Sequence, residues 1–282
     1  MTLAVVARFP WGRLREVSDG VAGAGFAVEQ AVFLATDSRF SFADRTPDDR
    51  GQKVYPVAND AGLVFAGDVL AAQRAIRSIR KYFERRDRKS KEEPAEHVGR
   101  LIEAAYANER RRVEGKARPR PLHSLHILVG VCDHRGQSAV VRYSDSSGFR
   151  PIYLTGVEAI GWPQDIVRFK AALLETEANE WGIGTVDPTP DRWVMHVVMA
   201  MRDAVDAPQN PGSVGGPIQA LAITSRGMSM PSISWTEGDP MDASTWTDAT
   251  ISSESVRPFT AGRGSAAAGL PEPELVVEHV CD

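Results

Sequence analysis

The stretch from residue 31 to residue 68 constrains the fold most, because it holds three apolar runs with turn residues between them. The runs read A-V-F-L-A-T-D, G-Q-K-V-Y-P-V and G-L-V-F-A-G-D. Val and Phe dominate them while Gly, Asn and Asp separate them, a pattern typical of successive β-strands. Asp68 follows the last run directly and is a good N-cap residue, so we expect the first long helix to begin there.

Polar or small residues stand at the ends of these predicted strands. Asp37-Ser38-Arg39 ends the first, Lys53 opens the second, and Ala66-Gly67 ends the third, with 16 residues from Asp37 to Lys53 and 14 from Lys53 to Gly67. A further short apolar strand, Thr2-Leu3-Ala4-Val5-Val6-Ala7, opens the chain. Taken together, this pattern resembles the β-type proteasome subunits and bacterial proteasome-like peptidases, which are N-terminal-nucleophile hydrolases. The resemblance is sharp over residues 2–86 and looser to about residue 235.

The resemblance implies a catalytic role for four of these positions. Thr2 would be the nucleophile, and its own α-amino group, with a reference pKa of about 7.7–8.0, would be the base once Met1 is removed. Lys53 would favour the developing alkoxide, and Asp37 would orient Lys53. The backbone N–H of Gly67, ahead of a helix N-terminus, would donate to the oxyanion.

The resemblance also implies substrate contacts. Ser41 and Val69 align with positions whose backbone groups hold an extended substrate strand. Phe65 aligns with the floor of the specificity pocket, and a large Phe with Gly51 nearby indicates a pocket of modest depth.

Two late elements depart from the family pattern. Gly161-Trp162-Pro163 stands where relatives have a turn with a serine. In the segment 210–216, Ser213 fits the serine that holds the N-terminal amine, but Asn210 stands where an aspartate is expected. Asp206 or Asp203 is a candidate replacement.

The segment between the opening strand and residue 31 is longer than the turn that the family places there. We interpret Gly20, Gly23 and Gly25 as loop glycines, because a dinucleotide fingerprint needs a strand before it and a helix after it. If residues 2–8 and 31–37 pair antiparallel, this insertion lies at the end opposite Thr2, about 20 Å away.

The remaining pattern predicts an α+β fold. Helical spacing places Val69, Ala72, Ile76, Ile79 and Phe83 on one stripe of the first helix, to about residue 86. A second helix, from Pro94 to about residue 113, turns Val98, Leu101, Ile102 and Ala105 inward. Strands follow at 125–131, 138–143, 151–154 and 158–161, helices at 165–180 and 190–206, and strands at 218–224 and 227–235. The resemblance implies a four-layer αββα sandwich of two antiparallel sheets between helix pairs.

The chain divides at about residue 235. Residues 1–235 form the predicted hydrolase domain, and residues 236–282 lack periodicity and are rich in Ser, Thr, Gly, Pro and Asp. We expect this segment to be a flexible C-terminal tail.

Composition limits the functional classes. The 282 residues are 43% hydrophobic and 25% charged, as in an ordinary soluble domain, and the formal charge of −4 gives no case for nucleic acid. Two distant cysteines, Cys132 and Cys281, imply no disulfide framework. No segment is long and apolar enough to span a bilayer, so we expect a cytoplasmic protein. No cofactor is expected.

Two polar clusters have ordinary interpretations. His123, His126 and His134 have no Cys or carboxylate at ligand spacing, so they are interpreted as strand and turn residues rather than metal ligands. Arg110–Arg112 lie near a predicted helix end, where basic residues complement the helix dipole.

The sequence therefore favours a threonine-type peptidase acting on peptides or unfolded proteins, within a homo-oligomeric assembly that is compatible with a partner ATPase. Two alternatives stay open: a non-catalytic structural subunit on the same fold, and an amidase that acts on a small molecule by the same chemistry.

Overall fold

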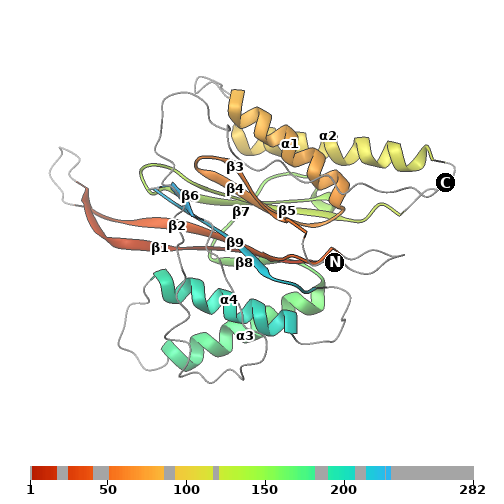
Figure 1. Cartoon of the computed structure of the whole chain (residues 1–282). Helices are drawn as coiled ribbons and strands as arrows, with labels where there is room; N and C mark the ends of the chain where they lie inside the picture. Colours follow the sequence, from red (N-terminus) through yellow and green to blue (C-terminus); the bar gives the residue numbers. More distant parts are fainter. Residues whose placement is uncertain are drawn as a thin grey trace.

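The fold has four layers, with two antiparallel sheets between two helix pairs (Figure 1). The computed structural model describes residues 2–17, 25–40, 51–85, 93–116, 121–181, 190–206, 214–225 and 227–229. The αββα arrangement predicted from the sequence is confirmed.

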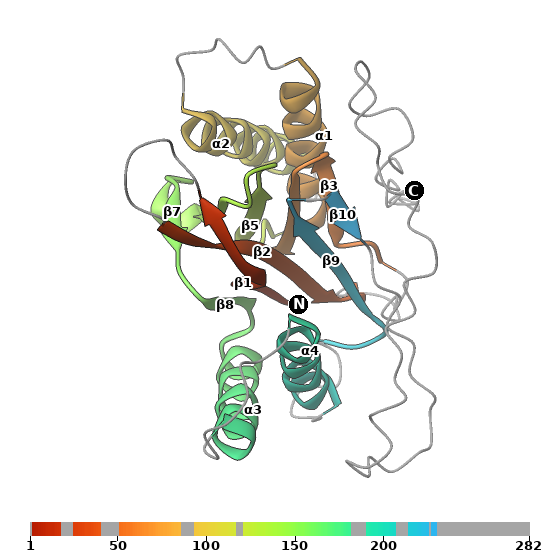
Figure 2. The same cartoon turned by 90° about the vertical axis from the view of Figure 1, so that its left-hand side faces the viewer.

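The first sheet contains the N-terminal strand at an inner position. Its order is β10-β9-β2-β1-β8, formed by β1 (Leu3–Val17), β2 (Gly25–Asp37), β8 (Val157–Gly161), β9 (Ile218–Thr224) and β10 (Gly227–Ser229). The predicted antiparallel pairing of the first two strands is correct, with Ala4 opposite Thr36 and Arg8 opposite Val32. The start of β1 therefore lies between the ends of β2 and β8 (Figure 2).

The second sheet follows chain order without a crossover. It runs β3 (Val54–Ala58), β4 (Ala61–Gly67), β5 (Leu125–Cys132), β6 (Ser138–Ser144) and β7 (Ile152–Leu154), each antiparallel to the next. A short 3₁₀ turn, η1 (Asp145–Ser147), leads from β6 toward β7. These strands match the predicted ones to within about one residue at each end.

Helices α1 (Val69–Arg85) and α2 (Pro94–Glu114) cover the outer face of the second sheet. The predicted stripe of α1 is confirmed, since all five of its residues lie in the core shared with that sheet. Asp68 caps α1 as predicted, accepting a hydrogen bond from the N–H of Ala71 at 3.0 Å. The inward residues predicted for α2 lie in the same core.

Helices α3 (Pro163–Trp181) and α4 (Pro190–Asp206) cover the outer face of the first sheet. Leu3, Val5 and Ala7 of β1 face these helices, while Ala4 and Val6 face the second sheet. This alternation is expected of a strand buried on both faces. It places the N-terminal strand at the centre of the molecule.

The predicted opening strand is too short, and the interpretation of Gly25 as a loop glycine is wrong. β1 continues to Val17 and β2 begins at Gly25, so the insertion extends the hairpin, and its register shifts between Pro10 and Leu14. Gly25 pairs with Val17 as a strand residue, whereas Gly20 and Gly23 lie outside the described residues. The insertion does lie at the end of β1 away from Thr2, as predicted, and the arm extends past the rest of the sheet (Figure 1).

The described helices include none that is both long and apolar enough to cross a membrane. The predicted tail from residue 236 lies outside the described residues, and β10 is described only to Ser229.

Candidate active site

The beginning of β1 is tied directly to Asp37. The N–H of Leu3 donates to Oδ1 of Asp37 at 2.9 Å, and the Thr36 hydroxyl donates to the carbonyl of Leu3 at 3.1 Å. Thr2, the residue before this anchor, is only 6% exposed. Continuing the alternation of β1 places Thr2 on the inner face with Ala4 and Val6. The candidate nucleophile and Asp37 thus lie at the same end of the first sheet.

Asp37 and Lys53 form a buried ion pair across the two sheets. Nζ of Lys53 lies 3.2 Å from Oδ2 of Asp37, and both side chains are fully buried. The same ammonium donates to the carbonyl of Arg39 and lies 5.3 Å from the centroid of the Phe40 ring. A buried charge needs such partners, because transfer from water is otherwise very unfavourable.

The Asp37 carboxylate accepts further hydrogen bonds from the backbone. Besides Leu3, the N–H groups of Arg39 and Gly215 donate to Oδ2 at 3.2 and 3.3 Å. Burial raises the pKa of Asp37 above its usual value, while the Lys53 ammonium and the N–H groups of Leu3 and Gly215 oppose the rise. Asp37 is therefore the point where β1, the segment after β2 and the segment before β9 meet.

Gly161 allows β8 to lie against the backbone of Thr2. Its φ is +139°, and a Cβ built there would lie 1.9 Å from the carbonyl oxygen of Thr2. Any other residue would displace either β8 or Thr2. The altered Gly161-Trp162-Pro163 element therefore keeps its glycine in contact with Thr2, while Trp162 is 36% exposed.

Gly67 is likewise required by a close approach. Its φ is +110°, and a Cβ would lie 1.7 Å from the carbonyl oxygen of Ser124. Gly67 ends β4 directly before α1, whose first turn is capped by Asp68. This is the position expected of an oxyanion donor at a helix N-terminus.

The predicted specificity residues lie in or beside the core under α1 and α2. Phe65 is 1% exposed and stacks on Tyr55 with ring centroids 6.3 Å apart, and Val69 packs against the same core. A Cβ on Gly51 would lie 2.4 Å from the ring of Phe40, so that ring already occupies the space beside Gly51. Phe40 is therefore a further candidate for the pocket wall, which no sequence pattern indicated.

Several predicted residues lie outside the described residues: Ser41, Ser213 and Asn210. The candidate replacements for Asn210 are on the last turn of α4. Asp206 pairs there with Arg202, and burial together with the charges of Asp206 and Glu175 raises the pKa of Asp203. Their contact with the N-terminal amine stays a prediction.

The backbone groups that bind Asp37 and Lys53 were not predicted from the sequence. Gly215 and Arg39 act here through main-chain atoms, which no side-chain pattern in the sequence indicates. The G-G pair at 215–216 is the one local signal, because paired glycines often allow a close backbone approach. Gln219 was missed as well: its amide binds both Lys53 and Gly51.

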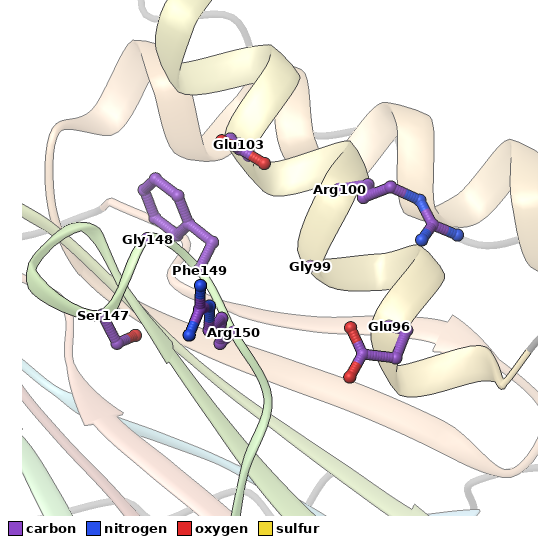
Figure 3. Close-up of a pocket in the computed structure, with 8 residues that line it drawn as sticks. All are labelled: Glu96, Gly99, Arg100, Glu103, Ser147, Gly148, Phe149 and Arg150. Carbon is purple, nitrogen blue, oxygen red and sulfur yellow. The ribbon is translucent and has the colours of Figure 1, made fainter.

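A cavity of about 370 Å³ lies elsewhere, between α2 and the turn after β6 (Figure 3). Glu96, Gly99, Arg100 and Glu103 line it from α2, and residues 147–150 line it from the turn. It shares no residue with the Asp37–Lys53 region. Its Ser147 hydroxyl donates to the carbonyl of Ser144 and accepts a hydrogen bond from the Ser144 hydroxyl.

Within the described part of the chain, no group of three or more His, Cys, Asp or Glu residues could hold a metal ion. The charged groups at Asp37 are instead the Lys53 ammonium and the Asp37 carboxylate, which lie beside the start of β1.

Comparison with known protein families shows which family this chain belongs to. The proteasome subunit family matches residues 17–157, half of the 282-residue chain. The chain belongs to the proteasome subunit family. Its matched region contains Asp37, Lys53 and Gly67 and begins after Thr2. A search of the curated proteins finds no match.

Proposed function

We propose that this proteasome-family chain is a threonine-type peptidase that uses Thr2 as its nucleophile after removal of Met1. The observation that supports this most directly is the link from Leu3 through Asp37 to Lys53. The carboxylate holds the backbone beside Thr2 at 2.9 Å and the ammonium at 3.2 Å. Catalytic groups need this kind of fixed relative position.

In the proposed reaction, Oγ of Thr2 attacks the carbonyl carbon of the peptide bond while the Thr2 amine takes the hydroxyl proton. The Gly67 N–H stabilises the oxyanion, and Lys53 favours the alkoxide by its charge. The protonated amine then passes its proton to the leaving nitrogen, the C–N bond breaks, and an ester on Thr2 remains. Water, deprotonated by the same amine, hydrolyses the ester and restores the hydroxyl.

The amine must be free for this chemistry. With Met1 retained, the Thr2 nitrogen would be an amide without a basic lone pair. Mass spectrometry of the intact chain, with and without a peptide epoxyketone or β-lactone, tests both requirements at once. We expect a chain without Met1 that gains one inhibitor mass on Thr2, and Thr2→Ala should gain none. An intact Met1, or an unreactive Thr2, would contradict the proposal.

A non-catalytic subunit is the second candidate, because two late elements differ from the catalytic pattern. Trp162 and Pro163 replace the serine turn beside Thr2, and Asn210 replaces an aspartate. A stable assembly that contains a chemically inert Thr2 would favour this function. An amidase is distinguished by turnover of small amides without turnover of peptides.

We also infer a homo-oligomeric, cytoplasmic particle, supported by the family membership. Native mass spectrometry gives the number of subunits. Stimulation of peptide or unfolded-protein hydrolysis by a co-purified ATPase would identify that partner.

A further inference from the structure

Gln219 lies beside the buried ion pair without belonging to it. On β9 it is in register with Thr36 of β2, and its neighbour Ile218 is in register with Asp37. Successive side chains of a strand point to opposite faces of the sheet. Ile218 and Ala220 face the helices, so Gln219 lies on the other face with Leu221 and Ile223, which pack between the two sheets. Its side chain therefore faces the second sheet, next to the strand end that carries Asp37.

The amide of Gln219 binds the segment that leads into β3. Its Oε1 accepts a hydrogen bond from the N–H of Lys53 at 2.9 Å, and its Nε2 donates to the carbonyl of Gly51 at 3.0 Å. A primary amide supplies one acceptor and donors in a fixed plane, so it satisfies both groups together. The side chain thus binds this segment much as a neighbouring strand would.

The segment from Gly51 to Lys53 is consequently fixed at two points. Gln219 binds it from the first sheet, and the N–H of Gly51 donates to the carbonyl of Ser38, one residue after Asp37, at 2.9 Å. A lysine stem has four flexible bonds, so the place of its ammonium depends on how firmly its backbone is held. We propose that Gln219 is a positioning residue for Lys53, holding its ammonium at Asp37 and Thr2. This inference rests on the proposed role of Thr2.

A merely structural role would affect stability but not the reaction of a folded protein. Gln219→Glu separates the two roles because glutamate has nearly the same shape. Its carboxylate can accept from the N–H of Lys53 but cannot donate to the carbonyl of Gly51, whereas the protonated acid can do both. The variant should therefore regain activity relative to the native protein as the pH falls.

The experiment measures the rate constant of Thr2 acylation by a peptide β-lactone, using intact mass and the full chain. Gln219→Leu should stay folded by circular dichroism and react about ten- to a hundredfold more slowly, the effect of a small misplacement. Gln52→Leu is the matched control, because Gln52 adjoins Lys53 but donates to the carbonyl of Val54 at 3.2 Å. Its rate should stay within about twofold of native. The rate of Gln219→Glu relative to native should rise as the pH falls from about 7 to about 4, the range in which glutamate, with a reference pKa of about 4.3, takes up its proton.

A folded Gln219→Leu variant that reacts at the native rate would overturn the inference and leave Thr2 as the nucleophile. A flat relative pH profile for Gln219→Glu would overturn it equally, and decides the matter if Gln219→Leu does not fold. A native protein that never reacts at Thr2 overturns both this inference and the proposed function.

Discussion

Oδ2 of Asp37 lies 3.2 Å from Nζ of Lys53, and neither side chain reaches solvent. Removing one partner of such a pair leaves an uncompensated buried charge, which typically lowers stability by about 3–5 kcal/mol. Replacing both by neutral groups of similar size avoids that penalty. Stability and activity should therefore respond differently to single and double substitutions.

The first prediction concerns this difference. Lys53→Met should lower the free energy of unfolding by about 3–5 kcal/mol. Adding Asp37→Asn should recover only part of this loss, because asparagine removes the buried charge but its NH2 group cannot accept hydrogen bonds from the N–H groups of Arg39 and Gly215. Neither variant should be acylated at Thr2, because both lack the ammonium. Urea unfolding and inhibitor labelling measure the two effects.

Lys170→Met is the control: Lys170 is half exposed and 3.8 Å from Glu158, so its loss should change little. Acylation of Lys53→Met at the native rate would contradict the role of Lys53.

The second prediction concerns the contact between Gly161 and Thr2. Gly161→Ala places a methyl group 1.9 Å from the carbonyl oxygen of Thr2, so the strand end must move. We expect lower stability, by more than the roughly 1–3 kcal/mol of backbone strain alone, and loss of Thr2 acylation.

Gly156→Ala is the matched control for that variant. Gly156 also has a positive φ, +75°, but a Cβ there meets no atom within 4 Å. Gly156→Ala should therefore lower the free energy of unfolding only by the roughly 1–3 kcal/mol of backbone strain, and Thr2 should be acylated at the native rate. Equal loss of acylation in both variants would mean that the contact with Thr2 is not the cause.

Local sequence patterns predicted most of the fold. Apolar runs, the Asp68 cap and the α1 stripe depend on neighbours in sequence, so they could be read directly. The hairpin arm was missed because glycines and a proline weaken strand patterns, while pairing between β1 and β2 compensates for them across the chain.

The candidate site was predicted less completely. Asp37 and Lys53 are charged residues at strand ends, so their spacing identified them. Gln219 is 166 positions from Lys53 and contacts its backbone, which no local pattern reveals. Gly215 and Arg39 contribute main-chain groups, whose positions follow from tertiary packing alone.

The third prediction concerns pH. Burial lowers the pKa of His126 below 6.5, assisted by Arg142 and opposed by Asp145. The unfolded chain therefore binds a proton at His126 more readily than the folded chain. Protonation favours unfolding, so the free energy of unfolding is highest above about pH 6.5, where His126 is neutral in both states, and falls on acidification. His126→Gln should lose less stability than the native protein between about pH 7 and pH 5. Urea unfolding across this range measures it. Identical profiles for His126→Gln and the native protein would contradict the assignment.

The fourth prediction concerns the domain boundary. All described helices and strands end at or before Ser229, so we infer that residues 236–282 are not needed for the sandwich. A chain ending at residue 235 should unfold at the native temperature and react normally at Thr2. Differential scanning calorimetry and labelling test this, and a chain that no longer folds would show that the tail belongs to the domain.

The fifth prediction concerns the outer helix layer. Glu109 of α2 is fully buried, and its carboxylate binds Arg74 of α1 and Arg112, each at 3.1 Å. Glu109→Gln removes the charge that joins the two helices. Since both arginines are about 40% exposed, water can replace part of the interaction, and we expect a loss of about 1–2 kcal/mol in the free energy of unfolding.

Thr2 acylation should stay within about twofold of native, because these helices lie outside the sheet that carries Lys53. Glu103→Gln, an exposed position on the same helix, is the control and should leave both quantities unchanged. A large loss of acylation in Glu109→Gln would instead show that the packing of α1 against α2 sets the position of the Gly67 strand end.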